Sequence, residues 1–263
     1  MTNTNRRKIK VLIATLLILI MSAFTLSGCT FSEALDNVVE LQELREQNAH
    51  LTEENTQLKE ELATLKFSLE FPDGIVDTDV ILNNVNRTVE DLSNGDCLQV
   101  TGNAVVVING GKFNGGHTPL GGAGNTAVWC NSADAKVVIN GGEFTIGGLA
   151  EGDVGHIDLI YCSAGTIEIN GGTFMGEDDT VWLVNCKDAN YIDNTASIVI
   201  KGGTFVNWNP ADNCSEGEHT NFVPEGYIVV SEVINQDKDD EYILYTVVEG
   251  EEEPEVSDTP NEF

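Results

Sequence analysis

The distribution of apolar residues divides the chain into a helical part and a part made of stacked strands. Within residues 32–69, which contain no glycine or proline, apolar side chains recur with a seven-residue period. One core position of this heptad holds Leu44, Leu51, Leu58 and Leu65, and the other holds Leu41, Asn48, Asn55, Leu62 and Leu69. The period predicts an α-helix of about four heptads whose leucine seam pairs in a left-handed coiled coil.

Two asparagines inside the seam indicate how the helices pair. The amides of Asn48 and Asn55 find partners across a parallel, in-register pair, and they favour that pairing at some cost in stability. Glu54 then faces the opposite charge of Lys59 on the neighbouring chain. We therefore expect a parallel homodimer, with a trimer as the main alternative and a single solvated helix as the second. Residues 71–74, Phe-Pro-Asp-Gly, end the helix.

Beyond residue 75 apolar and polar residues alternate, and the pattern repeats four times. Paired glycines begin at Gly110, Gly141, Gly171 and Gly202, thirty or thirty-one residues apart. Three apolar columns match around them: Val106, Val137, Ile167 and Ile198; Ile108, Ile139, Ile169 and Ile200; Phe113, Phe144, Phe174 and Phe205. Because side chains alternate between the faces of a strand, these columns face inwards and Glu168 faces outwards.

A second strand precedes each glycine unit. These strands are expected at residues 97–100, 127–130, 158–162 and 181–186. The order strand, loop, strand, glycine corner, strand describes one coil of a parallel β-helix, in which glycine permits the sharp turn. We therefore predict an all-β fold, a parallel β-helix of about four turns over residues 72–205.

Three cysteines end equivalent strands of this stack. Coils spaced by about 4.8 Å make Cys130, Cys162 and Cys186 successive neighbours in one column. A disulfide between two of them fits that spacing, and a ladder of buried thiols is the alternative. The remaining cysteines are Cys29, Cys97 and Cys214. The five that follow Cys29 leave at least one thiol free or bonded to another chain.

The last part of the chain is expected to close the stack. Residues 227–233 and 242–248 are typical of two strands joined by a polar turn, a hairpin that would cover the exposed edge of the last coil. Residues 206–250 are therefore assigned to a C-terminal cap. The acidic residues 251–263 are predicted to be disordered.

With these residues in view, the repeat resembles a known family. The units VVVINGGKF, KVVINGGEF, TIEINGGTF and SIVIKGGTF resemble the right-handed, pectate-lyase-like β-helix repeats of bacterial surface proteins and phage fibre proteins. The resemblance covers about half of the chain and implies a right-handed β-helix. It does not imply one activity, because this fold hosts lyases, hydrolases, adhesins and inert spacers.

The chain begins with the layout of an export signal. A basic start at residues 6–10 leads into an apolar stretch at residues 11–26, which is shorter than the roughly 20 residues that span a bilayer. The sequence Leu-Ser-Gly-Cys that ends at Cys29 resembles the lipobox of bacterial lipoproteins. That resemblance implies that residues 1–28 are removed and that the thiol of Cys29 is diacylated. An ordinary signal peptide with a chance cysteine is the alternative.

The predicted lipid anchor and the net charge together indicate where the protein is located. Two acyl chains would hold the protein stably on the extracytoplasmic face of a bacterial cell membrane. Residues 29–71 then form the lipidated N-terminus and the coiled-coil stalk. The net charge of −30 and pI of about 4.1 repel nucleic acid and anionic headgroups, so no nucleic-acid partner is expected and lipid must supply the membrane attachment.

Catalytic candidates are few. The resemblance implies that a lyase of this fold would use an Arg or Lys base beside carboxylates that hold calcium. No arginine follows Arg87 in the chain. Glycosidases need two carboxyl groups that flank the bond, for which Asp178 and Asp179 are weak candidates, as is the group Asp153, His156 and Asp158. No cofactor or metal is expected, with calcium bound by oxygen atoms near Asp178 as the alternative.

Exposed aromatic residues favour carbohydrate binding. Trp129 and Tyr161 occupy equivalent positions before the cysteine column, and Trp182 lies in the next strand. Facing outwards they would form a patch for sugar rings, whereas facing inwards they would be core. We expect a non-enzymatic surface lipoprotein that presents a β-helix to a glycan or a surface protein, or that acts as a structural spacer. The alternative is a cell-surface polysaccharide lyase or glycoside hydrolase.

Overall fold

The structure of the protein, a computed structural model, describes residues 31–93, 95–119, 125–153, 155–177, 181–236, 238 and 241–250 of the 263-residue chain. The chain divides into two compact units, residues 1–57 and residues 58–263. The predicted signal peptide, the lipidation site at Cys29 and the acidic tail lie outside the described residues. These three assignments therefore stay predictions.

A long helix, α2 (Phe31–Glu70), forms where the heptad pattern predicts one. The leucines of its seam are exposed in the single chain, with Leu51 54% and Leu58 55% accessible. The helix is therefore confirmed, while its pairing in a coiled coil stays a prediction. Among the described residues, no helix combines the length and the apolar character needed to cross a membrane.

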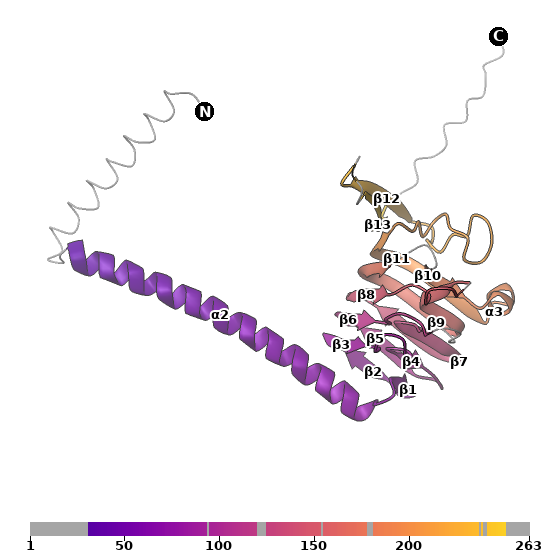
Figure 1. The fold of residues 1–263 in the computed structure, drawn as a ribbon, viewed down its shortest axis with the longest axis horizontal. Coiled ribbons are helices and arrows are strands. Elements are labelled where there is room, and N and C mark those ends of the chain that lie inside the picture. Colours follow the sequence, from indigo (N-terminus) through magenta and orange to yellow (C-terminus); the bar gives the residue numbers. More distant parts are fainter. Residues whose placement is uncertain are drawn as a thin grey trace, which may run out of the picture. The chain divides into compact units, whose positions relative to one another are not determined.

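The strands that follow build an all-β parallel β-solenoid of about four turns (Figure 1). In chain order they are β1 (Ile75–Val76), β2 (Val80–Leu82), β3 (Val85–Thr88), β4 (Gln99–Val100), β5 (Val105–Ile108), β6 (Gly111–Asn114), β7 (Val128–Ile139), β8 (Glu143–Ile146), β9 (Ile157–Gly176), β10 (Val181–Cys186) and β11 (Ala196–Val206). A short helix, α3 (Asp188–Ile192), lies between β10 and β11. Equivalent strands of successive coils pair in parallel, which confirms the predicted solenoid.

The solenoid ends in an antiparallel hairpin. Strands β12 (Tyr227–Ile234) and β13 (Tyr242–Glu249) pair with each other, and β13 pairs with the last solenoid strand, β11. The hairpin hydrogen bonds along part of β11, from Gly203 to Val206, that would otherwise be an open edge.

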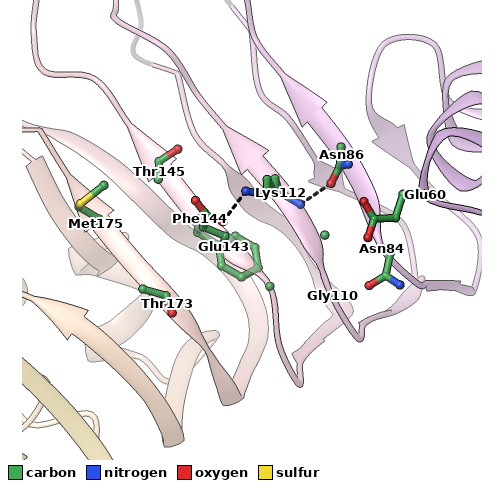
Figure 2. Close-up of a pocket in the computed structure, with 12 residues that line it drawn as sticks. Glu60, Asn84, Asn86, Gly110, Lys112, Glu143, Phe144, Thr145, Thr173 and Met175 are labelled. Carbon is green, nitrogen blue, oxygen red and sulfur yellow. Dashed lines mark hydrogen bonds and ion pairs between the residues drawn. The ribbon is translucent and has the colours of Figure 1, made fainter. Parts of the chain in front are cut away.

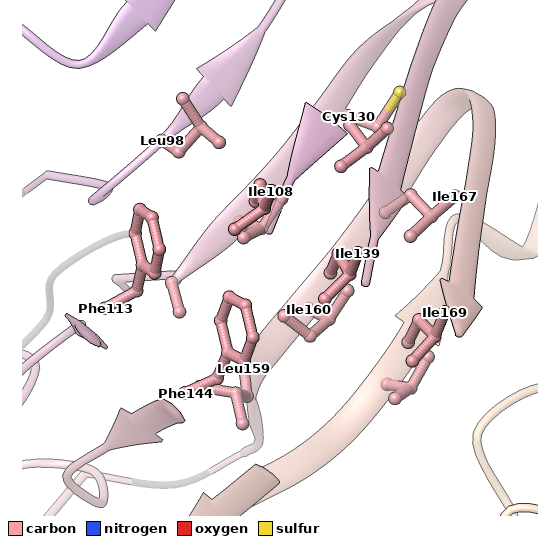
Figure 3. Packing of buried hydrophobic residues seen from close by; sticks show 14 of the residues in the cluster. Leu98, Ile108, Phe113, Cys130, Ile139, Phe144, Leu159, Ile160, Ile167 and Ile169 are labelled. Carbon is pink, nitrogen blue, oxygen red and sulfur yellow. The ribbon is translucent and has the colours of Figure 1, made fainter. Parts of the chain in front are cut away.

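The interior holds the columns that the repeat predicts (Figure 3). Four phenylalanine rings, each fully buried, stack with centroids 5.3, 5.0 and 4.7 Å apart and interplanar angles of 7° to 9°. They are Phe113, Phe144, Phe174 and Phe205. In the aliphatic column, Val137 pairs with Ile167 and Ile167 with Ile198, so each coil places a β-branched aliphatic side chain above that of its predecessor.

The corner after each aliphatic column is built by glycine and asparagine. At Gly111, with φ of +113°, a Cβ would overlap the carbonyl oxygen of Val85 in the preceding coil. Beside the corners, amide side chains form a ladder in which Asn109 donates to Asn83, Asn140 to Asn109 and Asn170 to Asn140, at 2.9 to 3.0 Å. The N-G-G sequence of the repeat therefore joins coils through both steric fit and hydrogen bonds.

The last turns of α2 close the first coil. Phe67 and Phe71 are buried in the same apolar core as the solenoid strands. Arg87 pairs in register with Phe113, so a guanidinium takes the place of the phenylalanine column in the first coil. It lies 5.6 Å from the ring centre of Phe67 and donates hydrogen bonds to the carbonyl oxygens of Phe71 and Pro72. The helix end is thus part of the solenoid core.

The cysteine column also lies as predicted. Cys162 pairs in register with both Cys130 and Cys186, and all three are buried as free thiols. A hydrogen bond with Cys162 and burial raise the pKa of the Cys130 thiol, and burial raises the pKa of Cys97 to about 12. Because the thiolate is the reactive form, these raised pKa values predict low reactivity for the thiols of Cys130 and Cys97. Cys214 alone among the described cysteines is exposed.

Alkylation of the native protein tests this thiol arrangement. We expect a maleimide to label Cys214 within the folded domain and to label the four buried cysteines only after denaturation, because burial shields their sulfur atoms from the reagent. Mass spectrometry of tryptic peptides locates the label, and Cys214→Ser is the control that abolishes native labelling. Native labelling at Cys162, or a disulfide from Cys162 to a neighbour, would contradict the expectation.

Candidate functional site

The predicted aromatic residues lie on the outside of the solenoid. In β7, β9 and β10, partly exposed Trp129, Tyr161 and Trp182 alternate with buried neighbours. Trp129 pairs in register with Tyr161, and Trp182 pairs with Asp158. The sequence left their direction open, and the register places all three on the outer face of one sheet.

Trp129 and Tyr161 form one aromatic pair on this face. Their ring centroids are 6.3 Å apart with planes inclined by 36°. The indole Nε1 of Trp129 donates to the hydroxyl of Ser163 at 2.8 Å, and that hydroxyl in turn donates to Asn131 at 2.8 Å. These hydrogen bonds hold the indole in a fixed orientation while part of its face stays accessible.

Trp182 belongs to an aromatic pocket of about 570 Å³, which Trp129 and Tyr161 do not line. The imidazole of His156 stacks on Trp182 with centroids 4.5 Å apart. Trp208 lines the same pocket and packs at 5.4 Å against Phe205, the last member of the buried phenylalanine stack. Its polar lining includes Asn207, Asn209, Asp212 and Asn213. An aromatic floor with amide and carboxylate groups around it suits a sugar ring.

A polar cluster adjoins both aromatic groups. Asn185 pairs in register with Tyr161 and donates from Nδ2 to Oδ1 of Asp158 at 3.0 Å. Burial raises the pKa of Asp158 to about 6, although the hydrogen bond from Asn185 opposes the shift. Burial also raises the pKa of Glu216 to about 7, against the hydrogen bond from the backbone N–H of Cys186 and with the help of nearby carboxylates.

A second groove, of about 460 Å³, lies on another face of the same unit (Figure 2). Two of its three charged lining residues are paired, because Lys112 Nζ lies 2.8 Å from Glu143, and the third is Glu60. The backbone N–H of Lys112 also donates to Asn86 at 2.9 Å. Unlike the aromatic pocket, the groove has no indole among its described lining residues.

His117 acts as a bridge between loops of different coils. Its Nδ1 lies 3.2 Å from Asp91 and its Nε2 lies 2.7 Å from Glu177. These carboxylates raise the pKa of His117, with Asp91 as the largest contributor. The imidazole is thus engaged on both nitrogens, which gives it a structural role between three loops.

Among the sequence-predicted catalytic candidates, the structure describes Asp153, His156 and Asp158. Asp178 and Asp179 lie outside the described residues. His156 stacks on Trp182, and Asp158 accepts its bond from Asn185. Across the described part of the chain, no group of three or more His, Cys, Asp and Glu side chains is arranged to hold a metal ion.

Glu216 was missed by sequence reasoning. It lies in a loop without the repeat, so no column predicted that its carboxylate would reach Cys186 at the end of β10. The polar residues of the aromatic pocket, Asn209, Asp212 and Asn213, were likewise not predicted, because they also follow the last corner.

No family model, curated protein or solved structure matches the chain. Functional inference therefore depends on the geometry of the outer face.

A pH titration of stability tests the environment of Glu216. Its pKa is about 7 in the folded protein, against an ordinary value of 4.5, so the folded state holds the proton more tightly. The resulting stabilisation is complete below the unfolded pKa and is lost as pH rises through about 7. In a buffer that contains a metal chelator, we expect the thermal midpoint of the wild type to fall with rising pH more steeply than that of Glu216→Gln. Circular dichroism measures both, with Glu218→Gln as the control, and equal slopes would contradict the assignment.

Proposed function

We propose that the protein is a non-enzymatic surface lipoprotein that binds a glycan on the outer face of a right-handed β-helix. The observation that carries the proposal is the aromatic pocket of Trp182, Trp208 and His156, together with the partly exposed pair Trp129 and Tyr161 on the outer face. Sugar rings stack on flat apolar faces while their hydroxyl groups bond to polar groups at the rim.

The pairing of the lysine side chains supports glycan binding more than lyase chemistry. A lyase needs a free basic side chain, but Glu168 accepts from Lys136 at 3.1 Å and from Lys201 at 3.0 Å. These lysines, Lys201 foremost, lower the pKa of Glu168, as expected for a stable ionic cluster. Lys112 is paired with Glu143. The described lysines of the repeat are thus largely occupied by carboxylates.

A glycoside hydrolase is the second candidate, and one observation favours it. Asp158 and Glu216 have pKa values near 6 and 7, in the range that a general acid needs at neutral pH. Asp158 also lies in register with Trp182, at the edge of the aromatic surface. Both carboxyl groups, however, are held by hydrogen bonds from Asn185 and Cys186, which suits a fixed structural role.

The proposal places this binding face on a paired stalk. Diacylated Cys29 would anchor the chain, and the exposed leucine seam of α2 would pair two copies. Two binding faces on one anchored assembly would raise the avidity for a repetitive polymer without any new contact. Weak binding by each pocket is then sufficient for attachment to a surface.

Affinity electrophoresis with soluble protein lacking residues 1–29 tests glycan binding. Against neutral and acidic polysaccharides, we expect retention by at least one polymer and its loss in Trp182→Ala, because the variant removes the stacking surface. Ile81→Ala is the matched control, since Ile81 is 63% exposed on another strand. Release of reducing ends that Asp158→Asn abolishes would establish the hydrolase instead, and no retention by any polymer would overturn glycan binding.

Sedimentation equilibrium of the same soluble protein tests the stalk. We expect the mass of a dimer for the wild type and of a monomer for Leu51→Asp, because a carboxylate in the seam opposes the burial of leucine. Ala49→Asp puts the same charge on the outer side of the heptad and should leave the mass unchanged. A trimer mass would select the alternative assembly, and a monomeric wild type would contradict pairing.

A further inference from the structure

Three oxygen-bearing side chains meet where the last coil joins the C-terminal loop. Asp158 comes from β9, Asn185 from β10 and Glu216 from the loop that follows β11. Asn185 is only 6% exposed, yet its Oδ1 has no hydrogen-bond donor among the described residues. Oε2 of Glu216 is likewise buried and has no donor there.

The hydrogen bonds of the three side chains bring them together. Nδ2 of Asn185 donates to Oδ1 of Asp158 at 3.0 Å, so the buried amide of Asn185, with its unpartnered Oδ1, lies beside that carboxylate. The loop of Glu216 lies along β10, because Ser215 Oγ donates to the carbonyl of Val184 at 2.8 Å. Oε1 of Glu216 accepts from the N–H of Cys186, the residue after Asn185, at 2.6 Å. The two unpartnered oxygens therefore lie at the same junction.

This set of atoms lacks positive charge. The charged groups that act on Glu216 are Asp188 and Asp158, both carboxylates, and the phenol of Tyr161 is their neutral neighbour. A buried acceptor without a donor destabilises the folded state, and a charged one does so more strongly. The junction is thus incomplete without a species that offers positive charge or a proton to Asn185 and Glu216.

We propose that Asp158, Asn185 and Glu216 bind one divalent cation with the chemistry of Ca²⁺, and that this ion fastens the C-terminal loop to the last strands. Two carboxylates and an amide carbonyl are hard oxygen ligands of the kind Ca²⁺ takes. Because the ligands come from β9, β10 and a loop, they suit the adaptable geometry of Ca²⁺ better than the strict octahedron of Mg²⁺. A site with two carboxylates and one amide is also consistent with the lack of a described three-member His, Cys, Asp and Glu cluster.

The ion would also order a wall of the aromatic pocket, although the proposal does not depend on glycan binding. Asp212, Asn213 and Cys214 line the pocket with Trp182 and immediately precede Ser215 and Glu216 in the same loop. A cation that holds Glu216 against β10 therefore restrains these lining residues.

Calcium titration of the full chain in detergent, after removal of metal ions, tests the site. We expect Ca²⁺ to raise the thermal midpoint of the wild type at a pH above about 8, where Glu216 is ionised, and Mg²⁺ to raise it less. Tb³⁺ should give luminescence sensitised by Trp182, which lies in register with Asp158, and Ca²⁺ should quench it by competition.

Glu216→Gln is the decisive variant. Its amide keeps an acceptor for the N–H of Cys186 and adds a donor for Oδ1 of Asn185, so it should abolish the Ca²⁺ response and melt above the metal-free wild type. Glu218→Gln, an exposed change in the same loop, should keep the wild-type response. Asp158→Asn provides a second test if Glu216→Gln does not fold.

The possible outcomes distinguish a cation bound at this site from a proton on Glu216 and from an ion bound elsewhere. A wild-type midpoint that ignores Ca²⁺ but rises on acidification would assign the junction to a proton on Glu216 and overturn the proposal. An unchanged Ca²⁺ response in both Glu216→Gln and Asp158→Asn would assign the ion to other acidic residues, with the same consequence. Loss of the response in these variants while Glu218→Gln retains it would support the site.

Discussion

The structure depends on the stacking of equivalent side chains from one coil to the next. Each phenylalanine ring lies about 5 Å from its counterpart, which is the spacing of paired strands, so ring contacts and backbone hydrogen bonds reinforce one register. A slip by one residue would turn every buried column outwards. Even the polar components follow this rule, because the asparagine ladder at the corners and the thiols of Cys130 and Cys162 repeat at the same interval.

The fixed register determines the chemistry of the outer surface. Once Val128 and Cys130 face the core, Trp129 between them must face solvent, and the same constraint acts on Tyr161 and Trp182. The aromatic residues lie on β7, β9 and β10, and both β7 and β10 pair with β9. Because this backbone is held in place, the aromatic rings lose little further conformational entropy when a ligand binds. A rigid sheet therefore holds its partly exposed aromatic residues at fixed positions relative to one another.

The repeat allowed most of the interior to be predicted from the sequence, because four aligned copies identify each column independently. The direction of Trp129 was not predictable, since alternation inside a short strand needs a known register to start from. Glu216 gave no signal at all: its contact with Cys186 joins a loop that occurs once to a strand that repeats. Residues 178–179, the predicted carboxylate pair, lie outside the described residues, so their role stays a prediction.

The ends of a solenoid differ physically from its middle, and this difference explains where the polar chemistry gathers. A middle coil finds an identical neighbour on each side, whereas an end coil must be covered by something that does not repeat. At the first coil, Arg87 replaces the stacked ring and bonds to carbonyls at the end of α2. At the last, the loop of Glu216 and the β12–β13 hairpin provide the cover. When irregular backbone covers an end coil, carboxylates and amides become buried without the matched partners that a repeat provides. Buried, incompletely paired polar groups, and with them the capacity to bind an ion or a ligand, are therefore expected at such a junction.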